Sequence, residues 1–231
     1  MITIEHLVKK FGGQVAVNIE DVSLKSGEVV GLVGNNGAGK TTLMRLIMDL
    51  TRADEGRILS KGRNVALSEE WKLYTSAYID SGFLVEFLTA EEYFQFIGRC
   101  HDLNKKEVEE RLCDFDRFLG GEILGNNKII KNFSAGNKQK AGIVGAMMLR
   151  PDFLLLDEPF NFLDPSSQVE MRRLLLDCNH RFGTTMLLSS HNLEHITEVS
   201  TRILLMEKGL LLKDLDNHDK LAYETLNKYF E

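Results

Sequence analysis

GNNGAGKT, residues 34–41, is the stretch that decides the fold of this 231-residue chain. It follows the apolar run Val29–Val33, which reads as a buried strand, and it opens a helical pattern that extends from Lys40 to Met48. Glycines in such a loop let successive backbone N–H groups curl around phosphate oxygens, where a β-carbon would collide. The pattern G-x-x-x-x-G-K-[ST] between a strand and a helix therefore predicts a phosphate-binding loop.

The side chains of this loop have distinct expected tasks. Lys40 would reach the β- and γ-phosphates of a nucleotide, and the Thr41 hydroxyl would hold Mg²⁺. The positive end of the helix points at the same phosphates. From residue frequencies alone, the pattern arises in roughly one chain of this length in a hundred. The expected nucleotide-binding residues are Gly34, Asn35, Asn36, Gly37, Ala38, Gly39, Lys40, Thr41 and Thr42.

Phosphoryl chemistry also needs a carboxylate at the end of a neighbouring apolar strand, and this chain supplies two. Asp157 and Glu158 directly follow the run Phe153–Leu156. We expect Asp157 to sit in the shell of Mg²⁺ and Glu158 to polarise the attacking water as a general base. An acidic pair can also simply solvate the end of a strand, but the phosphate-binding loop favours the catalytic interpretation.

The order of the elements predicts the fold class. Strands at 2–7, 15–19 and 29–33 precede a stretch from 89 to 150 that reads as helical throughout, and strands alternate with helices again after Pro151. Such alternation is typical of a mostly parallel sheet with helices on both faces. We expect one α/β domain over residues 1–231, whose core comprises 1–84 and 151–231 and carries a helical insertion at 85–150.

Composition excludes several other classes of protein. The chain has a net charge of −6, 43% hydrophobic residues and three separate cysteines, Cys100, Cys113 and Cys178. The acidic balance argues mildly against a nucleic-acid partner, whose phosphates need a basic face. We see neither a signal peptide nor an apolar run of the ~18 residues that span a bilayer. We therefore expect a soluble chain, with any membrane-crossing part supplied by another protein.

Further motifs make the resemblance specific. Ser134, Ala135, Gly136 and Asn137 follow Phe133 at the start of a helix, where a serine N-cap and free N–H groups can bind an anion. With the two motifs above, the chain resembles the ATPase subunits of ABC transporters over essentially its whole length. In that family this motif, usually LSGGQ, contacts the ATP held by a second subunit.

The resemblance assigns roles to other residues. Leu163 and Asp164 match the D-loop that bridges two subunits, and His191 matches the switch histidine that contacts the γ-phosphate and helps to orient the attacking water. Phe11 matches the aromatic residue that stacks on adenine. The resemblance to the family also implies a P-loop NTPase core with an antiparallel N-terminal β part and an inserted helical subdomain. ATP and Mg²⁺ are the cofactors that it implies.

In the signature motif, Ala135 and Asn137 stand where the family often has glycine and glutamine; asparagine keeps a polar amide and alanine costs little on a helix, so we expect the site to function. A second motif also departs from the family. Its Q-loop usually supplies a glutamine that touches Mg²⁺ and the attacking water, whereas the corresponding stretch here, residues 78–84, has no glutamine. Asp80 is the candidate for that position, with Ser81 one residue away. A carboxylate can ligate Mg²⁺, but it adds negative charge near the triphosphate. If Asp80 occupies this position, we expect slower hydrolysis or a tighter dependence of hydrolysis on the partner. The alternative is that Asp80 is an ordinary turn residue.

The resemblance implies partners as well. Two ATPase subunits, identical or merely similar, would sandwich ATP and drive a separate integral membrane permease from the cytoplasmic face, with no nucleic acid involved. The stretch LTAEEY at 88–93 resembles bacterial drug, antibiotic and peptide exporters and favours export over import. The alternative is a soluble ABC ATPase that drives a translation factor or an iron–sulfur scaffold, although translation factors of this type usually carry two ATPase domains.

Overall fold

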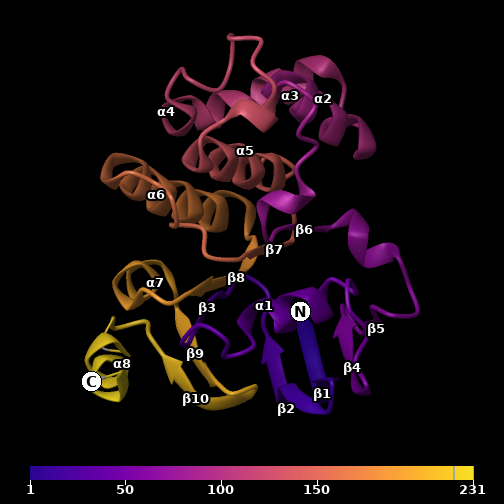
Figure 1. Cartoon of the computed structure of the whole chain (residues 1–231), viewed down its shortest axis with the longest axis vertical. Helices are drawn as coiled ribbons and strands as arrows, with labels where there is room; N and C mark the ends of the chain where they lie inside the picture. Colours follow the sequence, from indigo (N-terminus) through magenta and orange to yellow (C-terminus); the bar gives the residue numbers. More distant parts are fainter. Residues whose placement is uncertain (221, 231) are drawn as a thin grey trace.

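The computed structural model describes residues 1–220 and 222–230 and contains two sheets (Figure 1). The smaller sheet is antiparallel, as expected for the N-terminal part, and its strand order is β2-β1-β4-β5. Its strands are β1 (Ile2–Phe11), β2 (Gln14–Leu24), β4 (Glu55–Ser60) and β5 (Arg63–Asn64).

The larger sheet positions the phosphate-binding loop. Its order is β10-β9-β3-β8-β7-β6, and every neighbouring pair is parallel except β10 with β9. The ends of β3, β8, β7 and β6 therefore meet at one edge. The strands are β3 (Val29–Val33), β6 (Thr75–Tyr78), β7 (Phe153–Leu156), β8 (Thr185–Ser190), β9 (Arg202–Glu207) and β10 (Leu210–Asp216).

Helices cover both faces of this sheet, because its strands are apolar on both sides. Leu154 and Leu156 of β7 belong to a core that includes α5, α6, α7 and α8, whereas Phe153 and Leu155 belong to a second core with α1 and the smaller sheet. The helices of these cores are α1 (Lys40–Ile47), α5 (Ala135–Met147), α6 (Pro165–Phe182), α7 (Leu193–Val199) and α8 (Ala222–Phe230).

The remaining helices gather at the end of the molecule opposite the smaller sheet (Figure 1). A capping box at Thr89 and Glu92 starts α2. These helices are α2 (Ala90–Cys100), α3 (Lys105–Leu112) and α4 (Asp116–Leu119). Short 3₁₀ turns are η1 (Glu70–Leu73), η2 (Ser81–Phe83), η3 (Cys113–Phe115) and η4 (Ile130–Asn132).

The expected fold class is confirmed, with one correction. Residues 89–150 are not helical throughout: residues 120–129 form an irregular segment, in which Gly120, Gly121 and Gly125 have positive φ. Glycine readily adopts that conformation, and it ends helices for the same reason. The domain boundaries at 84/85 and 150/151 stay a prediction. Among the described residues, no helix combines the length and apolar character needed to cross a membrane.

Candidate functional site

The loop between β3 and α1 has the backbone that its glycines permit. Gly39 is the N-cap of α1 and has φ 107°, a conformation that L side chains rarely adopt. A β-carbon there would meet the carbonyl oxygen of Ala16 and would lie 2.8 Å from Met206 Cε. A β-carbon on Gly34 would collide with the carbonyl oxygen of Met206. Neither glycine can be replaced without moving the neighbouring backbone.

Lys40 is a buried ammonium group that faces this loop. Its side chain donates to the carbonyl oxygens of Gly34 at 2.6 Å and Asn35 at 3.4 Å. The ammonium nitrogen also lies 3.7 Å from Glu158 Oε1. A buried charge must be paired and hydrogen-bonded, and these carbonyl contacts meet that need within the protein. They also hold the positive charge beside the loop that would receive phosphates.

Two oxygen-bearing side chains that can bind a metal ion, Thr41 and Asp157, meet next to the loop. The Thr41 hydroxyl donates to Asp157 Oδ2 at 2.5 Å, and Ser189 donates to the other oxygen of the same carboxylate. Hard oxygen donors of this kind suit Mg²⁺, which commonly uses one or two carboxylates together with water and phosphate oxygens. Within residues 1–220 and 222–230, no group of three His, Cys, Asp or Glu could hold a metal by itself. The pairing of the Thr41 hydroxyl with the Asp157 carboxylate fits a Mg²⁺ ion whose remaining ligands are phosphate oxygens and water.

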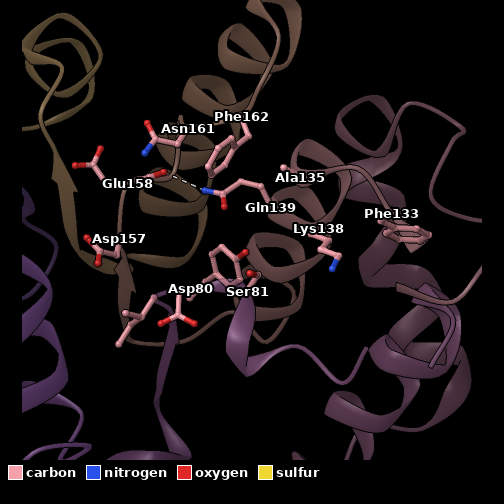
Figure 2. Close-up of a pocket in the computed structure, with 12 residues that line it drawn as sticks. Asp80, Ser81, Phe133, Ala135, Lys138, Gln139, Asp157, Glu158, Asn161 and Phe162 are labelled. Carbon is pink, nitrogen blue, oxygen red and sulfur yellow. Dashed lines mark hydrogen bonds between the residues drawn. The ribbon is translucent and has the colours of Figure 1, made fainter. Parts of the chain in front are cut away.

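Glu158 is held from three sides. Its N–H donates to Ser189 Oγ at 2.9 Å, and its carbonyl accepts from Gln139 of α5 at 3.0 Å (Figure 2). Its carboxylate oxygen Oε2 lies 2.9 Å from His191 Nδ1. Glu158 also has a positive φ of 48°, which is uncommon for a residue other than glycine. These contacts hold a carboxylate and an imidazole together beside Lys40.

Two cavities adjoin these groups. One, of about 240 Å³, is lined by residues 36–42 of the loop together with Ala16, Asp157 and Glu158. The other, of about 480 Å³, lies between the loop after β6 and the start of α5 and shares Asp157 and Glu158 with the first (Figure 2). The expected residues 36–42, Asp157 and Glu158 thus lie at one place, beside His191.

Asp80 lies in the loop after β6 and lines the larger cavity. Its Oδ1 accepts a hydrogen bond from the N–H of Gly82 at 2.7 Å, so Asp80 caps the start of η2. Its Oδ2 lies 3.1 Å from Arg45 Nη2 of α1. Asp80 therefore has the contacts of a turn residue, and its role as a Mg²⁺ ligand stays a prediction.

Ser134 is the N-cap of α5, as the sequence predicts. Its hydroxyl oxygen accepts the N–H of Asn137 at 3.2 Å. A β-carbon on Gly136 would lie 2.6 Å from the carbonyl oxygen of Phe162, so glycine allows the first turn of α5 to approach that backbone. Ala135 lines the larger cavity. Ser134 is not among the described residues that line the smaller cavity at the loop.

The segment after Glu158 connects these parts to α6. Phe162 is 72% exposed with a positive φ, whereas Leu163 is buried. Asp164 is the N-cap of α6, and hydrogen bonds from Ser166 and Ser167 hold the pKa of its carboxyl group far below the usual range.

Phe11 is not among the described residues that line the smaller cavity at the loop. It ends β1, its side chain is 53% exposed, and Lys9 lies over its ring at 5.2 Å. The smaller cavity is instead lined by Ala16 from the next strand. Stacking of Phe11 on adenine stays a prediction.

Sequence reasoning missed the roles of three residues that the structure places in the site. Ser189 connects Asp157 with Glu158, Gln139 holds the Glu158 carbonyl, and Arg45 pairs with Asp80. A signal existed for two of them: Ser189 is a polar residue at the end of an apolar strand, and Arg45 follows Thr41 by four residues on the same helical face. No comparable signal marks Gln139.

Comparisons with known proteins agree with this arrangement. The family described as ABC transporter matches residues 17–161. The chain is 34% identical to the uncharacterized ABC transporter ATP-binding protein YcbN of Bacillus subtilis (strain 168), over 95% of this chain and 70% of that protein. It is 32% identical to the bacitracin transport ATP-binding protein BcrA of Enterococcus faecalis, with coverages of 94% and 69%. It is also 32% identical to the methionine import ATP-binding protein MetN of Clostridioides difficile (strain 630), with coverages of 95% and 70%.

A solved structure of an ATP-binding subunit of an ABC transporter superposes with a TM-score of 0.85 at 27% identity. The superposition covers 95% of this chain and 91% of that one. Because the fold, the loop geometry and the family match agree, this chain belongs to the ABC transporter family as an ATP-binding and ATP-hydrolysing subunit.

Proposed function

We propose that the chain hydrolyses ATP with Mg²⁺ at a site that two ATPase subunits complete, and that it powers export through a separate membrane permease. The observation that carries the proposal is the grouping of Lys40, the Thr41–Asp157 pair and the Glu158–His191 pair around one glycine loop. This set supplies a cation, oxygen donors for a metal, and a carboxylate beside an imidazole.

Each residue has a defined task in this proposal. The loop N–H groups and Lys40 bind the β- and γ-phosphates, while Thr41 and Asp157 hold Mg²⁺, which neutralises charge on the phosphates when bound. Glu158 accepts the proton of the attacking water, and His191 keeps the carboxylate and the water oriented. Asp80 is the candidate for the third protein oxygen near Mg²⁺.

A second subunit is proposed because Ser134 and the loop cavity do not meet within the described chain. Ser134 is the N-cap of α5, and the start of this helix is exposed at Ser134 and Ala135. The smaller cavity is lined by Ala16, loop residues and the two acids. An ATP bound at the loop would be closed off by residues 134–137 of a partner subunit, with the exposed Phe162 and Asp164 nearby. Dimer closure would then move the loop after β6 and helices α2–α5, which would contact the permease at the membrane.

Export is proposed from the resemblance of residues 88–93 to exporters. Similar proteins include one for bacitracin transport and one for methionine import, so identity alone favours neither direction. In the structure, Thr89 and Glu92 of this stretch form the capping box of α2, so the stretch also has a purely structural task. Identification of the permease decides between the two directions.

Replacement of Glu158 tests the hydrolytic site. We expect Glu158→Gln to lower turnover by about 10²–10⁴-fold, as loss of a general base does, while ATP affinity stays near that of the wild type. Steady-state phosphate release and equilibrium binding of ATP measure the two effects. Glu110→Gln is the matched control, because Glu110 is an exposed residue of α3 that pairs with Lys106 on the same helix. Near-normal turnover in Glu158→Gln would refute the assignment.

The same variant tests the shared site. With Mg²⁺ and ATP, Glu158→Gln should sediment as a dimer, because ATP that is not hydrolysed keeps the subunits together. Adding Ser134→Glu should return it to a monomer, because a carboxylate would then face the γ-phosphate. A dimer that forms equally well with Ser134→Glu would contradict the proposed role of Ser134.

A further inference from the structure

Helix α1 contacts two neighbouring carboxylates at the edge of the larger sheet. Thr41 and Arg45 are four residues apart and share one helical face. The Thr41 hydroxyl lies 2.5 Å from Asp157, and the Arg45 guanidinium lies 3.1 Å from Asp80. Each contact joins α1 to a residue that follows one strand of the sheet: Asp157 follows β7, and Asp80 follows β6.

The two acids are close because their strands are paired in parallel. Tyr78 of β6 is in register with Leu156 of β7, and the N–H of Asp157 donates to the Tyr78 carbonyl at 2.9 Å. Asp80 follows Tyr78 by two residues and lines the larger cavity together with Asp157 and Glu158. Asp80 therefore adds a third carboxylate to the larger cavity, which adjoins the proposed Mg²⁺ site through Asp157.

The Arg45–Asp80 pair compensates this additional charge without burying it. The two side chains are 45% and 44% exposed. An exposed ion pair contributes little to stability, so a competing cation can displace the guanidinium. A carboxylate oxygen is also a preferred ligand of Mg²⁺, which makes Mg²⁺ a suitable competitor.

We propose that Arg45 is a positioning residue that holds the Asp80 carboxylate in the nucleotide-free protein and releases it to Mg²⁺ when nucleotide binds. The inference rests on the proposed function and deepens it, because it names what regulates metal binding at the same site. While the pair is intact, Asp80 adds no net negative charge beside an entering triphosphate. When the pair opens, one cation replaces another on the same carboxylate.

The inference makes the contribution of Mg²⁺ to nucleotide binding depend on Arg45. Mg²⁺ must compete with the guanidinium in the wild type, but it has no competitor in Arg45→Ala. The factor by which Mg²⁺ tightens binding should therefore rise by about three- to fivefold in Arg45→Ala, the range set by the strength of an exposed ion pair. The increase should disappear when Asp80 is also replaced, because no carboxylate is then released.

A double-mutant cycle tests this expectation. The dissociation constant of a fluorescent, non-hydrolysable ATP analogue is measured with Mg²⁺ and with EDTA for wild type, Arg45→Ala, Asp80→Asn and the double variant. The ratio of the two constants gives the Mg²⁺ factor for each protein, without any measurement of hydrolysis. We expect Arg45→Ala to raise the factor in the presence of Asp80 and to leave it unchanged in the Asp80→Asn background.

Two further variants serve as controls. Arg45→Lys keeps a cation opposite Asp80 and should keep the Mg²⁺ factor near that of the wild type. Arg57→Ala removes an arginine whose partner Glu5, at 2.6 Å, lies on the smaller sheet, and it should leave the factor unchanged.

Two results would overturn the inference: a factor that Arg45→Ala does not change, or one that rises equally with and without Asp80. The second result would show that Arg45 acts by its own charge. If the wild type does not bind the analogue at all, the proposed function fails together with this inference.

Discussion

At the scale of single residues, three polar groups at the centre of the site are buried and are held by hydrogen bonds. Lys40, Asp157 and Ser189 are all largely inaccessible to solvent. Ser189 donates to Asp157 and accepts the N–H of Glu158, so one hydroxyl holds both acids. A buried polar group without a partner is costly, which makes such reciprocal contacts necessary for the fold as well as for the chemistry.

Replacement of Ser189 should therefore affect stability and activity together. We expect Ser189→Ala to lower the free energy of unfolding by about 1–3 kcal/mol, because it leaves the buried N–H of Glu158 and an oxygen of Asp157 without their partner. It should also lower turnover, because both acids lose their orientation. Chemical denaturation and steady-state phosphate release measure the two effects.

Thr75→Val is the matched control for Ser189→Ala. The Thr75 hydroxyl is also buried, but it has no hydrogen-bond partner in the described part of the chain. Its removal should be neutral or stabilising. If Ser189→Ala proves as mild as Thr75→Val, the hydroxyl does not hold the two acids.

Prediction from the sequence succeeds where neighbours in the chain decide the outcome. The glycine loop, Lys40 and Thr41 form one continuous pattern, and Asp157 and Glu158 follow one apolar strand. The role of Ser189 depends instead on β8 lying beside β7, which a single strand does not indicate. The Arg45–Asp80 contact likewise requires α1 and the loop after β6 to be adjacent.

At the scale of elements, α7 connects the histidine of the site to the core. His191 precedes this helix, and His195 lies within it, half-buried and stacked on Phe160 at 4.7 Å between ring centroids. Burial, and then the nearby Arg172 guanidinium, lower the pKa of His195 from its usual value of 6.5. The folded protein therefore favours the neutral imidazole.

This lowered pKa predicts how stability depends on pH. The unfolded chain takes up a proton at His195 as pH falls through about 6.5, before the folded chain does. The contribution of His195 to stability is therefore fully present above this pH and is lost as pH falls through the folded pKa. In His195→Gln, the free energy of unfolding should fall less between about pH 7.5 and 5.5 than in the wild type.

Chemical denaturation at the two pH values checks this expectation. His180→Gln, at an exposed position of α6, is the control and should keep the pH dependence of the wild type. An identical loss of stability in the wild type and His195→Gln would contradict the assignment.

Elements were predicted well where hydrophobic periodicity was uninterrupted. The buried strands β3 and β7 lie where the sequence indicates them. The helical prediction for residues 89–150 is wrong at 120–129. Ile123 is buried, but Gly120, Gly121 and Gly125 adopt positive φ. These glycines are the sequence signal that the helix is interrupted here.

At the scale of the whole molecule, two cores on opposite faces of one sheet place the loop cavity beside an open second cavity. The smaller sheet and α1 form one core, and α5–α8 form the other. The exposed Phe162 lines the larger cavity, which lies between the loop after β6 and α5. We infer that this surface is completed by a second ATPase subunit.

Purification of the tagged protein from detergent-solubilised native membranes, followed by mass spectrometry, tests the proposed transport function. We expect a stoichiometric membrane protein with several spanning helices, together with a second ATPase subunit that is either identical or similar. Recovery only from the soluble fraction, with ribosomal or assembly proteins in place of a permease, would contradict the transport claim while leaving ATP hydrolysis intact.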